Sequence, residues 1–211
     1  MQTDTFTNTI TSEAELRALL GVPSELVIRK QLPALDRHCR AFIALAPFVA
    51  VGTVSADGRS DVSPRGDAPG FVQVLDEHTL VIPERPGNRR FDTLRNILQT
   101  GTVGLFFIIP GVEETLRVNG RAVLVRDAEL LASLAAQGKA PWLAIAVTVE
   151  EAFLHCAKAF KRSHLWDAAT WPGRSALPSL AEMLHDQTHP ADATVAELAE
   201  SIEESYAKRL Y

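Results

Sequence analysis

Arginine is concentrated in one short segment of a chain that is acidic overall. Arg85, Arg89 and Arg90 fall within six residues, after a β-favoured run and at the start of a helical pattern. Asn88 lies among them and is a residue type that can cap a helix. A helix N-terminus offers free amide donors and partial positive charge, and arginine adds paired donors that match phosphate oxygens. The segment therefore predicts a phosphate-binding loop.

A structural interpretation of the same segment stays open. The arginines could solvate the start of the helix and pair with Glu84 and Asp92. Basic residues at a helix N-terminus oppose the helix dipole, which favours the functional interpretation. The formal net charge is −5, so a broad attraction to nucleic acid or to anionic membrane is not expected. Any anion that this chain binds must be held by a local cluster of cations.

A second segment, residues 61–71, ends a predicted strand and contains Ser63, Pro64 and Arg65. Proline inside a strand indicates an edge or a bulge, where exposed backbone donors can face a ligand. Arg65 could add a contact to a phosphate or to a ring. The alternative is a surface loop in which Arg65 pairs with Asp67, and this is the simpler interpretation of the segment taken alone.

Two His-Cys pairs, His38-Cys39 and His155-Cys156, raise the question of a metal site. Adjacent residues rarely point at one ion, and no CxxC or HxxxH spacing accompanies them, so no metal is predicted. Two cysteines cannot form a disulfide framework, and residues 1–10, polar and rich in threonine, do not resemble a signal peptide. No segment approaches the ~20 apolar residues of a membrane-spanning helix. We therefore expect a cytoplasmic protein.

Helices are expected at both ends of the chain. Residues 11–46 should be helical, with the Ser12/Glu15 capping spacing opening one helix that Gly21 closes. Ser24 should open a second helix that buries Leu26, Val27, Ile28, Leu32 and Leu35 and is interrupted at Pro33, and the pattern resumes over residues 39–45. Further helices are expected over residues 91–99 and 127–137 and in an extension of about 174–211, where Ser179/Glu182 and Thr194/Glu197 have capping-box spacing.

Strands are expected between these helices. The β-favoured segments are residues 48–54, 59–63, 71–75, 79–82, 103–109, 115–125 and 142–149. Asp57-Gly58 and Pro110-Gly111 are turn signals. Short strands joined by hairpins favour an antiparallel barrel over a parallel sheet, in one domain over residues 1–211.

These segments, in this order, resemble a known family. The Ser-Pro-Arg-Gly of residues 63–66, the Pro-Glu-Arg-Pro-Gly-Asn-Arg-Arg of residues 83–90, and residues 114–122 are similar to the FMN-binding split barrels related to pyridoxamine 5'-phosphate oxidase. Residues 156–166 resemble the C-terminal segment of one uncharacterised subgroup of these proteins. The resemblance covers about residues 25–170.

The resemblance implies a six-stranded antiparallel split β-barrel with flanking helices, which forms a homodimer with FMN at the subunit interface. The flavin phosphate would meet Arg89 and Arg90, with Asn88 in the same loop and Arg65 or Arg85 adding a contact. Val62, Ser63 and Pro64 would lie along the ring system, Arg117 and Asn119 would approach the flavin or the phosphate from either subunit, and Ser163 and Trp166 of the partner chain would cover the ring.

The implied activity is that of an FMN-dependent oxidoreductase acting on an unknown small molecule. The C-terminal region differs from that of pyridoxamine 5'-phosphate oxidase, so the resemblance does not imply that substrate. One alternative is a flavin-binding sensor, carrier or store without turnover. Another is a haem- or deazaflavin-binding member of the same superfamily, in which His78, His155 or His164 would be asked to ligate haem, although nothing in the sequence selects one of them.

Overall fold

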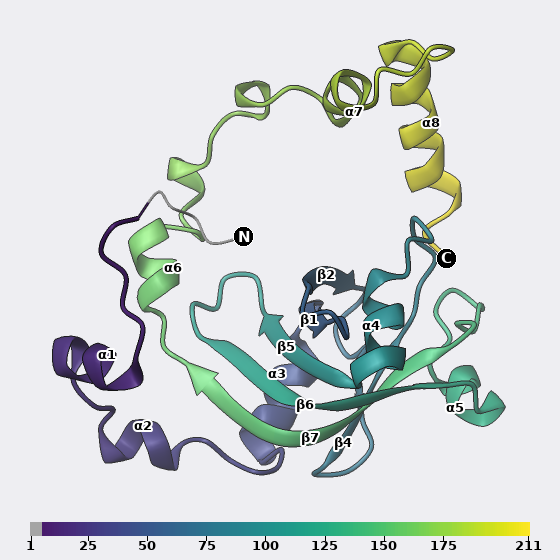
Figure 1. Cartoon of the computed structure of the whole chain (residues 1–211). Helices are drawn as coiled ribbons and strands as arrows, with labels where there is room; N and C mark the ends of the chain where they lie inside the picture. Colours follow the sequence, from purple (N-terminus) through teal and green to yellow (C-terminus); the bar gives the residue numbers. More distant parts are fainter. Residues whose placement is uncertain (1–5) are drawn as a thin grey trace. The chain divides into compact units, whose positions relative to one another are not determined.

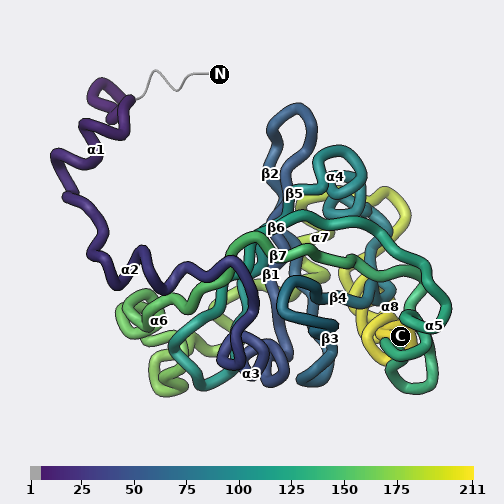
Figure 2. The backbone as a smooth tube through the Cα atoms, turned by 90° about the horizontal axis from the view of Figure 1, so that it is seen from below, coloured from purple at the N-terminus to yellow at the C-terminus, as the bar shows by residue number. Residues whose placement is uncertain are grey.

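The alternation of apolar and polar residues produces one antiparallel sheet, described for residues 6–211 by a computed structural model (Figure 1). Its seven strands follow the order β2-β1-β5-β6-β7-β4-β3, and every neighbouring pair is antiparallel. Their bounds are β1 Phe48–Val54, β2 Ser60–Gly66, β3 Gln73–Val74, β4 Thr79–Pro83, β5 Thr102–Ile108, β6 Thr115–Val125 and β7 Ala144–His155. The sheet does not close, because β2 and β3 form its two edges (Figure 2).

The predicted antiparallel sheet with flanking helices is confirmed. The strand count is seven rather than six, since the two-residue strand β3 pairs with β4 at one edge. The chain divides into two compact units, one ending at Gln31 and the other comprising Leu32–Tyr211, and the prediction of one domain over residues 1–211 stays a prediction. Residues 1–5 of the predicted polar N-terminus lie outside the described residues.

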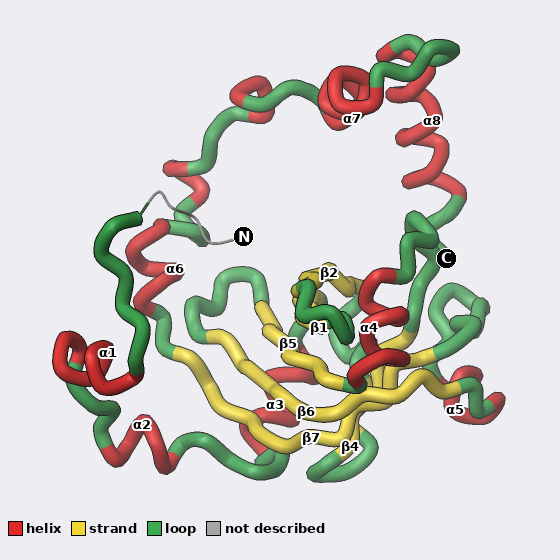
Figure 3. Tube along the Cα trace, viewed as in Figure 1, coloured by secondary structure: helices red, strands yellow, loops and turns green. Residues whose placement is uncertain are grey.

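The hydrophobic core occupies one face of the sheet. Alternate residues of β1, β5, β6 and β7 point into it, including Val49, Val51, Leu105, Phe107, Leu116, Val118, Ile145 and Val147. Helix α3 (Arg37–Leu45) adds Cys39 and Ile43, and helix α4 (Asp92–Thr100) adds Leu94 and Ile97 (Figure 3). Burying these side chains fixes which face each strand turns inward, because neighbouring residues of a strand point to opposite faces.

The first unit contains α1 (Glu13–Leu20) and α2 (Glu25–Arg29). Helix α1 begins as predicted, with Ser12 Oγ accepting a hydrogen bond from the Glu15 N–H. The Glu15 carboxylate accepts from the N–H of Thr11 rather than from that of Ser12, so the capping box is incomplete.

The predicted helix from Ser24 through Leu35 is wrong in extent, and its predicted burial is confirmed for Leu35 but wrong for its first turns. Helix α2 ends at Arg29, and Leu26, Val27 and Ile28 are exposed. The residue before a proline is restricted to extended backbone, and Leu32 exchanges two backbone hydrogen bonds with Ala152 of β7. Asp36 is the N-cap of helix α3, and its Oδ1 accepts hydrogen bonds from the N–H groups of His38 and Cys39.

The remaining helices follow the sheet. They are α5 (Ala128–Ser133), which ends before the predicted boundary at residue 137, α6 (Lys158–Ser163), α7 (Leu180–Thr188) and α8 (Val195–Lys208), with single 3₁₀ turns over Ala168–Thr170 and Arg174–Ala176. Both predicted capping boxes, Ser179/Glu182 and Thr194/Glu197, are formed. Within residues 6–211, no helix combines the length and the apolar character needed to cross a membrane.

A β-bulge in β6 depends on Gly120. The register between β6 and β7 shifts between Asn119 and Gly120. A Cβ atom on Gly120 would lie 2.0 Å from the carbonyl oxygen of Thr148, much closer than van der Waals contact allows. Because this oxygen belongs to the backbone, it cannot move aside as a side chain could. A bulge re-aims the side chains beside it, so Gly120 also decides where Asn119 points.

We expect Gly120→Ala to lower the free energy of unfolding by roughly 3 kcal/mol or more, because the new Cβ must displace a central strand. Urea unfolding followed by circular dichroism measures the change. Gly173→Ala is the matched control, since its Cβ would meet the nearest atom, Ser175 Oγ, at an ordinary 3.8 Å. Equal stability of the two variants would contradict the assigned role of the bulge.

Candidate functional site

The fold brings the two arginine-containing segments together. The end of β2 lies against the loop between β4 and α4, which we call the arginine loop (residues 84–91). Thr93 Oγ1, in the first turn of α4, donates a hydrogen bond to Asp61 Oδ2 of β2 at 2.9 Å. Residues that are about twenty to thirty positions apart in the sequence therefore form one surface.

Two ion pairs of opposite polarity join β2 to the arginine loop, and we call them the crossed ion pairs. Arg65 Nε lies 2.9 Å from Glu84 Oε2, and Arg85 Nε lies 2.7 Å from Asp67 Oδ2. The side chains are largely buried, with 13% and 20% of the first pair exposed and 15% and 4% of the second. The alternative prediction that Arg65 pairs with Asp67 is wrong, because each partner bonds to the loop instead.

Arg65 and Arg85 also donate to other groups of the protein. Arg65 Nη1 donates to Ser63 Oγ and to the carbonyl oxygen of Pro64, both at 2.9 Å. Arg85 Nη2 donates to the carbonyl oxygen of Leu134 at 3.0 Å. These two guanidinium groups fix the shape of the loop.

Asp67 is the acceptor of the second crossed ion pair and also bonds to Tyr211. Burial raises the pKa of Asp67, but hydrogen bonds from the Tyr211 hydroxyl, the Ala68 N–H and Arg85 outweigh burial and hold it below its ordinary value. The hydrogen bond to Asp67 raises the pKa of Tyr211. Asp67 is therefore a carboxylate at neutral pH and Tyr211 is its donor.

The far end of the arginine loop presents the other two predicted arginines to solvent. Arg89 and Arg90 are exposed, and Arg90 Nε lies 2.8 Å from Asp92 Oδ2, as the structural interpretation expected. Arg89 and Phe91 both adopt φ = 60°, in the left-handed region. Strained backbone of this kind costs about 1 kcal/mol or more per residue and is frequent at ligand-binding sites.

Helix α4 begins without a side-chain cap. Phe91 occupies the N-cap position and makes no capping hydrogen bond through its side chain. The prediction that Asn88 caps this helix is wrong, because α4 starts at Asp92 and Asn88 Oδ1 instead accepts a hydrogen bond from the N–H of Arg90 at 3.1 Å. The amide groups of the first turn, together with two exposed guanidinium groups, have the donor chemistry of an anion site.

The predicted cofactor-binding residues of strand β2 point alternately to the two faces of the sheet. Ser63 and Arg65 are half-buried on the core side, toward the arginine loop, whereas Val62 and Pro64 point to the opposite face and are exposed. Val62 lies across from Gly52 of β1, which pairs with Gly104 of β5. The register thus places two glycines in neighbouring strands, and this creates a shallow trough on the outer face of the sheet.

The trough has a volume of about 190 Å³ and contains two more predicted residues, Arg117 and Asn119. Asn119 Nδ2 donates to Glu151 Oε1 at 2.7 Å, and the Arg117 guanidinium carbon lies 5.2 Å from the centroid of the Phe153 ring. Glycine in a strand leaves room for the close approach of a ligand or of another backbone. The floor of the trough can therefore accept a flat group beside polar side chains.

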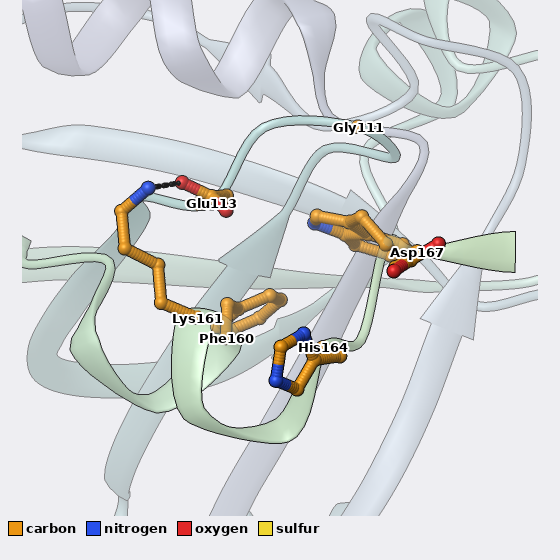
Figure 4. A pocket seen from close by; sticks show the side chains of 7 residues that line it. Gly111, Glu113, Phe160, Lys161, His164 and Asp167 are labelled. Atoms are coloured by element: carbon orange, nitrogen blue, oxygen red, sulfur yellow. Dashed lines mark ion pairs between the residues drawn. The ribbon is translucent and has the colours of Figure 1, made fainter. Parts of the chain in front are cut away.

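The predicted residues Ser163 and Trp166 lie elsewhere. Trp166 lines a pocket of about 400 Å³ together with Gly111, Glu113, Phe160, Lys161, His164 and Asp167 (Figure 4). Its indole Nε1 donates to the carbonyl oxygen of Val112 at 2.9 Å, and its ring lies 5.7 Å from that of Phe160. Ser163 Oγ donates to the carbonyl oxygen of Phe160. Across residues 6–211, no hydrogen bond or ion pair joins this pocket to the arginine loop.

The sequence analysis assigned no binding or positioning role to three residues of the site, Glu84, Asp67 and Tyr211. Glu84 and Asp67 stand next to predicted arginines, so charge alternation is a signal that could have found them. Tyr211 has no such signal, because it is separated from Asp67 by 144 positions.

A family model described as pyridoxamine 5'-phosphate oxidase matches residues 35–156. Comparison with curated protein sequences gives no match.

Three solved structures are similar to this chain. A candidate pyridoxamine 5'-phosphate oxidase from Lactobacillus delbrueckii is 24% identical, with a TM-score of 0.47, covering 59% of this chain and 98% of that chain. HupZ from Group A Streptococcus is 20% identical, with a TM-score of 0.47 and coverage of 57% and 93%. An FMN-binding protein from Syntrophomonas wolfei is 11% identical, with a TM-score of 0.44 and coverage of 56% and 83%.

We expect Asp67→Asn to lower the free energy of unfolding at pH 7 by about 2 kcal/mol, because it leaves the buried Arg85 without its counter-ion. A carboxyl group whose pKa is lower in the folded protein stabilises the fold above its unfolded pKa, and this contribution is lost as the pH falls through the folded pKa. The folded pKa of Asp67 lies below its ordinary value of 3.8, so the difference in stability between the variant and the unmodified protein should begin to shrink below about pH 4 and should vanish only below the folded pKa.

Urea unfolding at pH 7 and at about pH 3 measures both effects. Asp57→Asn is the control, because Asp57 pairs with Arg59 at the surface, where the two side chains are 58% and 86% exposed. That variant should change stability much less than Asp67→Asn does, because solvent screens an exposed ion pair. A loss for Asp67→Asn that is equally large at both pH values would contradict the assigned ion pair.

Proposed function

Because the chain belongs to the pyridoxamine 5'-phosphate oxidase family, we propose that it binds FMN, with the phosphate at the arginine loop and the ring system along β2. The residues matched to the family, 35–156, include β2, the arginine loop and α4. The observation that carries the proposal is the start of α4, where a helix N-terminus without a side-chain cap stands beside exposed Arg89 and Arg90. Anionic groups bind such termini because amide donors and the helix dipole act together.

The arginines have different parts in this proposal. Arg89 and Arg90 would contact the phosphate directly. The hydrogen bond from Arg90 to Asp92 uses Nε, and a guanidinium group has further donors on its two terminal nitrogens. Arg65 and Arg85 would hold the loop in position, since both are engaged by the crossed ion pairs and by carbonyl oxygens. Asn88 would shape the turn between Gly87 and Arg90.

The ring system would lie along the edge of β2, near Val62, Ser63 and Pro64. Within the described residues β2 pairs with β1 alone, so one of its backbone edges is open to a ligand. FMN, when bound, supplies the transfer of hydride or of electrons, while the protein binds and orients it. We therefore propose an FMN-dependent oxidoreductase that acts on a small molecule.

A second copy of the chain would complete the site. Val62, Arg117 and Asn119 lie on the outer face of the sheet, away from the arginine loop. Trp166 and Ser163 are likewise separate from the loop within one chain. A homodimer in which Trp166 of the partner subunit covers the ring would bring all the predicted residues to one cofactor.

A flavin-binding sensor, carrier or store remains the second candidate function, and it is separated from the first by turnover. Haem is disfavoured by the donor set, because a site built from arginines and a helix N-terminus suits a phosphate rather than an iron. Deazaflavin also carries a phosphate and would use the same loop.

The absorption spectrum of the purified protein, with the released cofactor identified by mass, tests this function. We expect FMN at about one molecule per chain, either as purified or after incubation with added FMN. A colourless protein that takes up no FMN would overturn the proposal. Reduction of the bound flavin by a nicotinamide, followed by reoxidation by a small molecule, would distinguish the oxidoreductase from a carrier.

We expect Arg90→Ala to weaken FMN binding by about 10- to 100-fold, because a hydrogen bond between charged groups contributes roughly 1.5–3 kcal/mol. The thermal midpoint should change little, since the Arg90 side chain is 74% exposed. Titration of flavin fluorescence measures the Kd. Arg59→Ala is the control, because Arg59 is an exposed arginine of the hairpin turn, and it should bind FMN as the unmodified protein does. Unchanged affinity of Arg90→Ala would show that the phosphate site is assigned wrongly.

A further inference from the structure

Tyr211 lies against the second crossed ion pair. Its hydroxyl donates to Asp67 Oδ1 at 2.7 Å, while Arg85 bonds to the other carboxylate oxygen, Oδ2. The Arg85 guanidinium carbon also lies 5.6 Å from the centroid of the Tyr211 ring. Tyr211 thus adds a hydrogen bond and a cation–π contact to a pair of largely buried charges.

Tyr211 ends a long segment that leaves the sheet and returns to it. We call residues 167–211 the C-terminal arm. At its beginning, the preceding Trp166 is bonded to Val112, and at its end the backbone oxygen of Tyr211 accepts a hydrogen bond from Lys139 Nζ at 3.0 Å. Between these points α7 and α8 pack against each other, and α8 has no buried residue (Figure 1).

The contacts of Tyr211 therefore couple the C-terminal arm to the arginine loop. Arg85 is the second residue of the loop, and Arg89 and Arg90 follow four and five residues later. Asp67 directly follows the end of β2. A change in the position of the Asp67 carboxylate moves Arg85, and Arg85 sets where the loop departs from β4.

We propose that Tyr211 is a positioning residue for the cofactor phosphate and that docking of the C-terminal arm and binding of FMN favour each other. The inference rests on the proposed function and adds a regulatory element to the same site. With Tyr211 docked, the second crossed ion pair has a third side chain bonded to it. A loop that is already ordered loses less conformational freedom when it binds an anion.

Coupling between two sites is reciprocal, so the inference makes two linked statements. Removing the docking contact must weaken FMN binding. Adding FMN must stabilise the docked arm by the same factor. A purely structural contact at Tyr211 would produce neither effect, even if its loss lowered the stability of the protein.

The test uses Tyr211→Ala, Tyr211→Phe and Tyr206→Ala in the full chain. Tyr211→Ala removes both contacts, whereas Tyr211→Phe removes the hydrogen bond and keeps a ring over Arg85. Tyr206 is the matched control, because it is a tyrosine of the same arm, lies in α8 and is 54% exposed. Flavin fluorescence gives the Kd for FMN, and limited proteolysis with and without FMN reports the docking of the arm.

We expect Tyr211→Ala to raise the Kd about 3- to 10-fold, Tyr211→Phe to lie between it and the unmodified protein, and Tyr206→Ala to have no effect. FMN should slow cleavage within the arm of the unmodified protein and of Tyr206→Ala, and should slow it less in Tyr211→Ala. If Tyr211→Ala does not fold, the same two measurements on Tyr211→Phe decide the matter.

Two failures are distinguishable. FMN binding that is equally tight in the unmodified protein and the Tyr211 variants, with cleavage of the arm indifferent to FMN, would overturn this inference and leave the proposed function standing. No FMN binding by the unmodified protein would overturn the proposed function and this inference with it.

Discussion

The crossed ion pairs are the constraint on which the candidate site depends. Strand β2 is an edge strand that contains a proline, and the arginine loop has no regular secondary structure. Strand β2 is positioned by its pairing with β1 along one edge, but the arginine loop has no backbone ladder that would define its own position. Two ion pairs of opposite polarity, Arg65–Glu84 and Arg85–Asp67, fix one against the other and leave no net charge between them. Breaking either pair leaves a largely buried charge without a counter-ion, which costs free energy. Both segments are therefore held in one arrangement.

Charge balance in these pairs separates the structural arginines from those available to a ligand. Arg65 and Arg85 bond to carboxylates and carbonyl oxygens and are nearly inaccessible. Arg89 and Arg90 are exposed at the far end of the loop, beside the start of α4. An acidic chain can therefore present a local cation cluster without burying unpaired charge. The structural interpretation describes Arg65 and Arg85, and also the Nε of Arg90, while the phosphate-binding role of Arg89 and Arg90 is the part that we propose.

Local signals predicted most of the fold. The bounds of β1 and β6 match the predicted residues 48–54 and 115–125, because alternating apolar residues and turn signals are read within a few positions. The second helix failed for a non-local reason. Leu32 pairs with Ala152 of β7, and no local sequence pattern near Leu32 predicts a partner that is 120 residues away.

The sequence predicted which residue types form the candidate site, but not which residues bond to one another. Residue types identified Arg89, Arg90 and Ser63 as candidates. The identity of each arginine's partner depends on how two distant segments cross, so Arg65 bonds to Glu84 instead of its neighbour Asp67. Asn88 failed as a helix cap because left-handed backbone at Arg89 and Phe91 extends the loop to the start of α4. The role of Tyr211 could not be predicted from the sequence, because a single aromatic residue has no periodic pattern around it.

The two faces of β2 bear on our proposal that a second chain completes the cofactor site. Alternation turns Ser63 and Arg65 toward the arginine loop and Val62 and Pro64 toward the trough, so a flat ring along this edge would meet both environments. The loop side already has its cations, whereas the trough side has two glycines and an exposed valine that bury little of a ring. Trp166 is bonded to Val112 in a separate pocket of its own chain. In the proposed homodimer, Trp166 of the partner subunit would cover the ring, and two-fold symmetry would place two cofactors at one interface.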